Sequence, residues 1–105
     1  WVRNNIYNYN WLYQMWSHLH DEFKIRYGKD HKSYTLLKEL LKNPPKNIPL
    51  NIPFNQPTQA MPDDVKNEDS IIAYRDYYVK YKKDFATWKT SIPEWYSEGI
   101  NNANV

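Results

Sequence analysis

The fold is decided by residues 9–27, YNWLYQMWSHLHDEFKIRY. Apolar and aromatic residues recur there at steps of three and four, which places them on one face of an α-helix. That face consists of Tyr9, Leu12, Trp16, Leu19, Phe23 and Tyr27. Asn5 or Asn8 can cap the start of this helix, and Gly28 can adopt the left-handed conformation that ends it. The stretch therefore predicts a long amphipathic helix.

Two further helices are predicted. The second runs from Ser33, its expected N-cap, to about Lys42, and the prolines that follow at 44 and 45 end it. The third runs from residue 69 or 70 to residue 91 or 92, where Pro93 stops it. Its seam again follows steps of three and four: Ile71, Tyr74, Tyr78, Tyr81, Phe85 and Trp88. Residues 93–96, PEWY, are expected to form an aromatic hook that folds back on the bundle.

Six of the seven prolines lie in residues 44–68. Apolar residues are interleaved with them, namely Ile48, Leu50, Ile52, Phe54 and Met61. A purely flexible linker does not need such residues, so this segment is predicted to be an extended strap that holds its apolar groups against the helices. A disordered proline-rich linker and a strap that binds a partner's aromatic groove are the alternatives.

Length and composition complete the predicted architecture. A chain of 105 residues has room for one small domain, and 17% aromatic residues can supply its core. We therefore predict an all-α fold, a small bundle of three main helices with a proline-rich strap. It forms a single domain over residues 1–98, followed by a polar tail at 99–105. The 9–27 face is expected to pack against the 71–88 seam.

Several classes of site are excluded or unsupported. The chain has no cysteine, so disulfides and thiolate chemistry are excluded, and two glycines cannot make a glycine-rich phosphate loop. No apolar run approaches the roughly 20 residues of a membrane span, so no membrane partner is expected. The chain starts at Trp1 without a signal peptide. We therefore expect an unsecreted chain that is the later part of a longer protein, or else a processed mature terminus.

The titratable residues form no recognisable catalytic or metal site. On a helix His18 and His20 lie about 200° apart, so they cannot chelate one ion together. We interpret His18 as a surface residue, His20 as a residue at the edge of the core, and His31 as a residue of a polar turn. The acidic residues between 63 and 76 suit the start of a helix. No catalytic residue is identified, and no metal or cofactor is expected.

Basic and aromatic residues form the most suggestive pattern. Lysine and arginine neutralise phosphates, and aromatic rings stack on unpaired bases. The predicted DNA-binding residues combine both kinds of side chain: Arg26, Lys29, Lys32, Arg75, Lys89, Trp88 and Trp95. The formal net charge is only +2, so a solvated helix face is the alternative.

Five short motifs carry a family resemblance. They are RYGKDHK at 26–32, QAMP at 59–62, AYRDYY at 73–78, FATWK at 85–89 and PEW at 93–95. With these motifs in this order, the chain resembles, from about residue 1 to residue 95, a family of small proteins encoded by marine tailed phages. Some members of that family are described as related to pyrimidine-dimer DNA glycosylases.

The resemblance implies an all-helical DNA-repair protein. Pyrimidine-dimer glycosylases attack the sugar through a free N-terminal amine, assisted by a glutamate near the start of the protein. In the phage family a portion rich in Cys, His and Lys precedes the stretch present here, which implies that Trp1 is internal and that its amine does not react. The chain is then expected to supply scaffold and contacts to double-stranded DNA.

The leading hypothesis is therefore the C-terminal part of a phage-type DNA-transaction protein resembling a pyrimidine-dimer DNA glycosylase. Its expected location is the cytoplasm of an infected host cell, or the virion. The alternative is a non-enzymatic viral structural or protein-interaction module, in which exposed rings and the strap contact a protein partner or a second copy. Whether the protein is an enzyme stays open at this stage.

Overall fold

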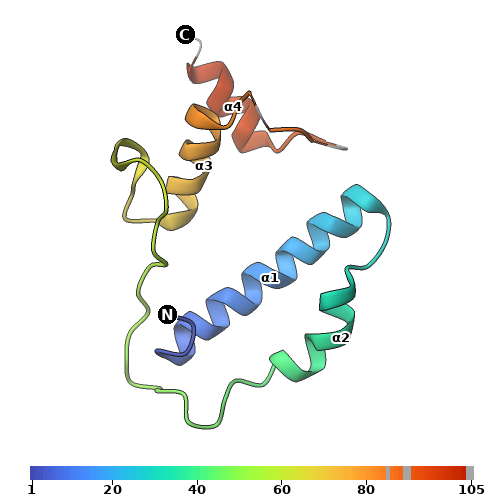
Figure 1. Ribbon diagram of the computed structural model, residues 1–105, viewed down its shortest axis with the longest axis vertical. Helices are drawn as coiled ribbons and strands as arrows, with labels where there is room; N and C mark the ends of the chain where they lie inside the picture. Colours follow the sequence, from blue (N-terminus) through green and yellow to red (C-terminus); the bar gives the residue numbers. More distant parts are fainter. Residues whose placement is uncertain (85, 89–90, 104–105) are drawn as a thin grey trace. The chain divides into compact units, whose positions relative to one another are not determined.

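The computed structural model describes residues 1–84, 86–88 and 91–103. Within these ranges the regular structure is all helical and no strand is present (Figure 1). The α-helices are α1 (Ile6–Tyr27), α2 (Lys32–Leu41), α3 (Ser70–Tyr81) and α4 (Glu94–Ala103), and one 3-10 helix, η1, spans Asp63–Val65. The predicted all-α class is therefore confirmed.

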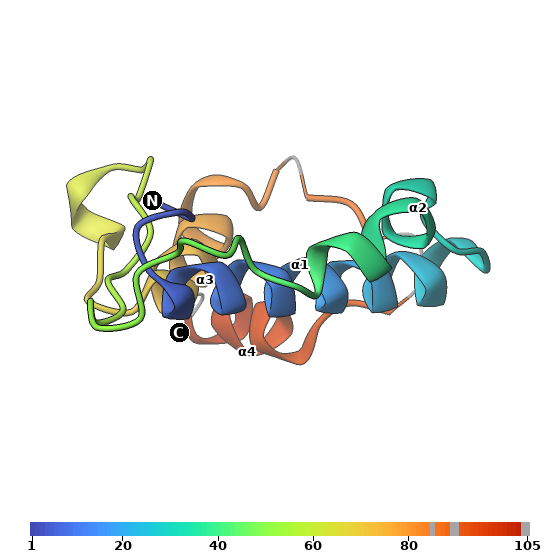
Figure 2. The same ribbon diagram turned by 90° about the horizontal axis from the view of Figure 1, so that it is seen from below.

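Backbone contacts divide the chain into two compact units, residues 1–55 (unit 1) and residues 56–105 (unit 2). In unit 1, α2 contacts α1 and runs back beside it (Figure 2). In unit 2, α3 contacts both η1 and α4. The boundary falls inside the proline-rich segment. The single domain over residues 1–98 and the packing of the 9–27 face on the 71–88 seam stay predictions.

Both ends of α1 follow from local sequence signals. Asn5 is the N-cap, and its side-chain oxygen accepts a hydrogen bond from the Asn8 backbone N–H at 2.8 Å. Gly28 closes the helix with φ 70°, and its N–H donates to the Lys24 carbonyl at 2.8 Å. A residue with a Cβ is strained at this φ. The expected cap and stop of the first helix are thus confirmed.

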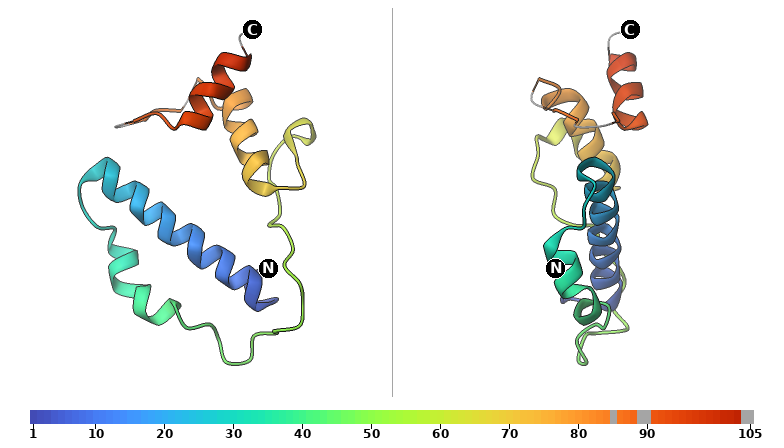
Figure 3. Two further views of the ribbon diagram at one scale, coloured as in Figure 1. Left: turned by 180° about the vertical axis from the view of Figure 1, so that it is seen from behind. Right: turned by 90° about the vertical axis from the view of Figure 1, so that its right-hand side faces the viewer.

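An asparagine cluster joins the start of α1 to residues 49–55. In Figure 3 the chain that follows α2 is seen to return to the start of α1. The Asn8 amide donates to the Trp1 carbonyl at 3.0 Å and to Asn55 Oδ1 at 2.7 Å, and Asn8 Oδ1 accepts from the Asn55 N–H at 3.2 Å. Asn5 donates to the Pro53 carbonyl at 3.2 Å. Asn5 and Asn8 are fully buried, so each of these bonds replaces one that water would otherwise make.

Replacing Asn8 with Ala should destabilise the chain by about 1–3 kcal/mol, because the buried amide makes three hydrogen bonds, to Trp1 and Asn55, that the variant loses. Urea unfolding followed by tryptophan fluorescence measures the change. Asn10→Ala is the matched control, since Asn10 is exposed on the same helix. Equal stability of the two variants would contradict a structural role for the cluster.

The start of α2 differs from the prediction. The N-cap is His31, not Ser33, and its Nδ1 accepts from the Ser33 backbone N–H at 3.2 Å. An imidazole nitrogen can replace the usual side-chain oxygen because it also accepts a hydrogen bond from a backbone N–H in the first helical turn. The helix therefore begins at Lys32 and ends at Leu41, next to the predicted end at Lys42.

In unit 2, α3 begins where predicted, with Asp69 accepting from the Ile71 and Ile72 backbone N–H groups. A polar contact then joins η1 to α3. The Asp64 carboxylate accepts from Lys80 Nζ, and Tyr81 Oη lies 2.8 Å from both of its oxygens. The hydrogen bond from Lys80, followed by that from Tyr81, lowers the pKa of Asp64 below its usual value. The contact is thus strongest when this carboxyl is ionised.

Acid should weaken this attachment. A lowered pKa in the folded state means that the stabilisation is present above the unfolded pKa, near 3.9, and is lost as the pH falls through the lower folded value. Asp64→Asn should therefore reduce stability at pH 7 and flatten its decline between about pH 5 and pH 2, as urea midpoints can show. Asp76→Asn serves as the control, because Asp76 is exposed on α3. A decline as steep in Asp64→Asn as in the wild type would refute the assignment.

The end of α3 corrects the sequence prediction. The helix ends at Tyr81, so the predicted continuation to residue 91 or 92 is wrong. Residues 82–84 form a turn, and Trp88 packs against Tyr96, with ring centroids 5.3 Å apart, instead of extending the α3 face. Of the predicted seam, Phe85 lies outside the described residues. Tertiary packing thus overrides the aromatic periodicity.

A second correction concerns residues 93–103, whereas residues 104 and 105 of the predicted polar tail lie outside the described residues. Instead of a hook and a polar tail, residues 94–103 form α4, whose first turn is closed by the Pro93 carbonyl accepting from Tyr96 and Ser97. Gly99 allows α4 to approach α3 closely, since a Cβ there would lie 2.6 Å from Val79 Cγ2. Residues 99–103, GINNA, show no apolar periodicity, so the sequence pattern did not indicate that this stretch packs closely against α3.

Gly99→Ala should destabilise the protein by about 1–3 kcal/mol through overpacking, although alanine has the higher helix propensity. The double variant Val79→Ala/Gly99→Ala should recover most of this loss relative to Val79→Ala alone. Thermal unfolding of the four proteins gives the coupling between the two positions. A stabilising Gly99→Ala would show that α4 does not pack on Val79.

Candidate functional site

Charge is distributed unevenly between the two units. Unit 1 holds eight Lys and Arg against four Asp and Glu, whereas unit 2 holds six against eight. Residues 24–32, which span the turn between α1 and α2, contain four basic residues and one acidic residue. The excess positive charge of the whole chain is therefore concentrated around this turn, which makes it the first candidate site for an anionic partner.

The predicted basic residues of unit 1 lie in different environments. Lys29 and Lys32 are exposed, in the turn and at the start of α2. The Arg26 side chain is only 14% exposed and binds Glu22 at 3.2 Å. Lys29 and Lys32 are thus more accessible than Arg26 to an anionic partner.

The predicted residues of unit 2 form a packing cluster. The Arg75 guanidinium lies 5.4 Å from the Trp95 ring centroid. Trp88 contacts Trp95 edge-on at 6.3 Å and also contacts Tyr96. Lys89 lies outside the described residues. These rings join the segment before α4 to α4 itself, in a unit whose net charge is negative.

Sequence reasoning missed a pocket beside the α1–α2 turn. Its volume is about 300 Å³, and both helices contribute to it. The lining residues are mostly aromatic or imidazole side chains: Trp16, Leu19, His20, Phe23, His31, Ser33 and Tyr34. We call this site the turn pocket. No single segment contains it, so helical periodicity alone could not reveal it.

His20 is the buried polar group of the turn pocket. It is 8% exposed and stacks on Tyr34 at 4.0 Å with an interplanar angle of 8°. Its Nδ1 accepts from the His31 backbone N–H at 3.3 Å, and its Nε2 lies 3.1 Å from Asp30 Oδ1. Because Nδ1 is an acceptor, the hydrogen of the neutral ring is on Nε2 and is donated to Asp30. The predicted core-edge position of His20 is confirmed.

His31 and Ser33 resemble a base and a nucleophile but act in capping. Ser33 Oγ lies 2.8 Å from His31 Nδ1, and the same nitrogen accepts the Ser33 N–H. Within the part of the chain that the structure describes, no carboxylate orients the His31 ring as a catalytic triad requires. The pair therefore gives no support for nucleophilic catalysis.

Three lysines lie next to residues that line or flank the turn pocket, but none of them is itself a lining residue. Lys24 Nζ lies 3.5 Å from Asp30 Oδ1, and Asp30 holds His20. Lys38 Nζ lies 5.3 Å from the centroid of the Tyr34 ring. Lys32 directly follows His31. A sequence signal for two of them existed, because Lys24 is four residues after His20 and Lys38 four residues after Tyr34, the spacing that puts side chains on one helix face.

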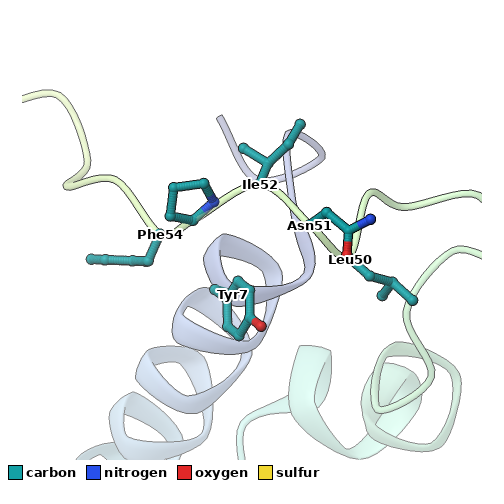
Figure 4. Close-up of a pocket in the computed structure, with 6 residues that line it drawn as sticks. Tyr7, Leu50, Asn51, Ile52 and Phe54 are labelled. Atoms are coloured by element: carbon teal, nitrogen blue, oxygen red, sulfur yellow. The ribbon is translucent and has the colours of Figure 1, made fainter.

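Unit 1 has two other hollows. Residues 50–54 cross the first turn of α1 beside Tyr7 and enclose about 460 Å³, without a charged side chain (Figure 4). An apolar groove of about 420 Å³ lies between α1 and α2, lined by residues such as Leu12, Met15 and Leu37. Among these three, the turn pocket is the one that imidazole groups line, those of His20 and His31.

Searches for known chemistry and known relatives gave no assignment. Among the residues that the structure describes, no three His, Asp or Glu side chains are grouped to hold a metal ion. No helix within the described ranges is long and apolar enough to cross a membrane. No family model, curated protein or solved structure matches the chain. The resemblance to the phage family therefore stays a prediction.

Proposed function

We propose that unit 1 binds nucleic-acid phosphates through the basic residues around the α1–α2 turn. The observation that carries the proposal is the concentration of positive charge at this turn, in a chain whose other unit is net acidic. Ammonium groups at exposed positions bind phosphates by releasing condensed counterions, which needs no base contact. Lys29 and Lys32 have the exposure that such contacts require.

This activity is compatible with the wider hypothesis from the sequence. We propose that the chain belongs to a phage-type DNA-transaction protein, acting in an infected cell or in the virion. DNA contacts by Arg75, Trp88 and Trp95 remain a prediction from the sequence. Phosphate binding by unit 1 does not depend on them. The hydrogen bonds between residues 49–55 and the start of α1 support a strap role for the first half of the proline-rich segment.

A salt titration tests the proposal. Fluorescence anisotropy with a labelled duplex of arbitrary sequence should show binding that weakens steeply with salt. Lys29→Ala/Lys32→Ala should reduce the slope of log K against log[salt] by about 2, one for each lost phosphate contact. Lys46→Ala/Lys83→Ala is the matched control, because it removes two exposed lysines that are not part of residues 24–32.

Two results would overturn phosphate binding at the turn. One is the absence of any binding at low salt. The other is a loss of slope in Lys46→Ala/Lys83→Ala as large as in Lys29→Ala/Lys32→Ala, since net charge alone would then explain the effect.

A second candidate function is that of a protein-interaction module. The apolar groove between α1 and α2 supports it, together with exposed leucines on α2, where Leu36 and Leu40 are 67% and 70% exposed. Such a surface suits an apolar partner or a second copy. Light scattering on the same samples distinguishes the candidates, because self-association without binding to any oligonucleotide favours this one.

A further inference from the structure

We infer that the turn pocket receives one unpaired base of a single-stranded nucleic acid, whose phosphates lie on the surrounding lysines. This inference rests on the proposed function and adds the ligand that the site takes. It differs from the double-stranded DNA expected from the sequence, because a base in a duplex has its faces stacked and its edge paired. Only a base that is free of both can enter a pocket.

The walls of the pocket match the faces of a base. Trp16, Phe23 and Tyr34 contribute rings from both helices, and the volume of about 300 Å³ is at the lower end of the range for small-molecule sites. Aromatic side chains bind bases of any sequence, since every base has a π-face. The pocket is therefore suited to one base without strong preference among the four.

Two polar groups in the pocket wall can orient a base by its edge. His31 Nδ1 accepts from Ser33, so the hydrogen of the neutral ring is on Nε2, which is left to donate to a ligand. Ser33 Oγ lies 2.8 Å from the same His31 nitrogen, and a hydroxyl oxygen has lone pairs that can accept from a ligand. A donor and an acceptor two residues apart complement a base edge that carries both kinds of group.

The surrounding charge fits the rest of a nucleotide. Lys38 Nζ lies 5.3 Å from the centroid of the Tyr34 ring, which lines the pocket, and Lys32 directly follows the lining residue His31. Lys24 is paired with Asp30, which also contacts His20. A ring-lined pocket among cations is the arrangement by which single strands are bound, with stacking for the base and ammonium groups for the phosphates.

The test compares a single strand that has bases with a single strand that lacks them and with a duplex. At one low salt concentration, anisotropy is measured with labelled oligothymidylate of about 15 nucleotides, with an abasic strand of the same length, and with a duplex of that length. The wild-type protein should bind oligothymidylate roughly 5- to 150-fold more tightly than the abasic strand, the range expected from stacking of one base. The duplex should not bind more tightly than oligothymidylate.

Two variants localise the effect to the turn pocket. His31→Asn keeps a residue that caps helices well but removes the imidazole, and Phe23→Leu removes a ring but keeps an apolar side chain. Each should reduce the preference for oligothymidylate over the abasic strand by about fivefold or more. His18→Asn is the matched control, since His18 is exposed on α1 and does not line the pocket. Circular dichroism checks that each variant is folded.

The outcomes separate the pocket from phosphate binding. Equal affinity for the thymidine and abasic strands, with the salt dependence retained, overturns the base pocket and leaves the proposed function standing. Tighter binding of the duplex, or a base preference that neither variant reduces, also overturns the pocket. Failure of every strand to bind at low salt overturns both.

Discussion

The structure of unit 1 depends on the buried hydrogen bonds between Asn5, Asn8 and residues 53–55. In residues 1–55, all of which the structure describes, four residues are buried, and Ile48 is the one apolar residue among them. The others are the two asparagines and His20. Two helices alone cannot enclose a large apolar core, so directed polar contacts determine where the proline-rich chain returns to α1. These polar contacts lie at the start of α1, whereas the turn pocket lies near its other end.

Directed polar contacts also organise the other end of α1. His20 is held by one bond from the His31 backbone and one to Asp30, so its ring orientation is determined by the turn itself. That orientation places the ring against Tyr34, the first aromatic residue of α2. The wall of the turn pocket is therefore organised by the same contacts that shape the turn, before any ligand is present.

Much of the fold was predictable because its signals are local. Asn5, Gly28 and Asp69 act within one helical turn of their own positions. Gly28 was predicted as the end of the first helix, Asn5 was one of two candidate caps, and the third helix was predicted to begin at residue 69 or 70. The start of α2 was placed at the wrong residue because histidine is seldom considered a cap. The end of α3 and the existence of α4 were missed, because they depend on Gly99 meeting Val79 and on Trp88 meeting Tyr96, contacts between separate segments. The turn pocket was missed for the same reason, because its lining residues come from two separate helices and the N-cap of the second.

The closure of unit 1 at Trp1 and Asn55 has a consequence for protein engineering. The indole N–H of its first residue donates to the backbone carbonyl of its last at 2.8 Å, so the two ends of the unit meet. Segments with adjoining ends can be excised, permuted or inserted into a host loop without a spacer. Residues 1–55 are therefore suited to transplantation as a cassette into a loop of another scaffold.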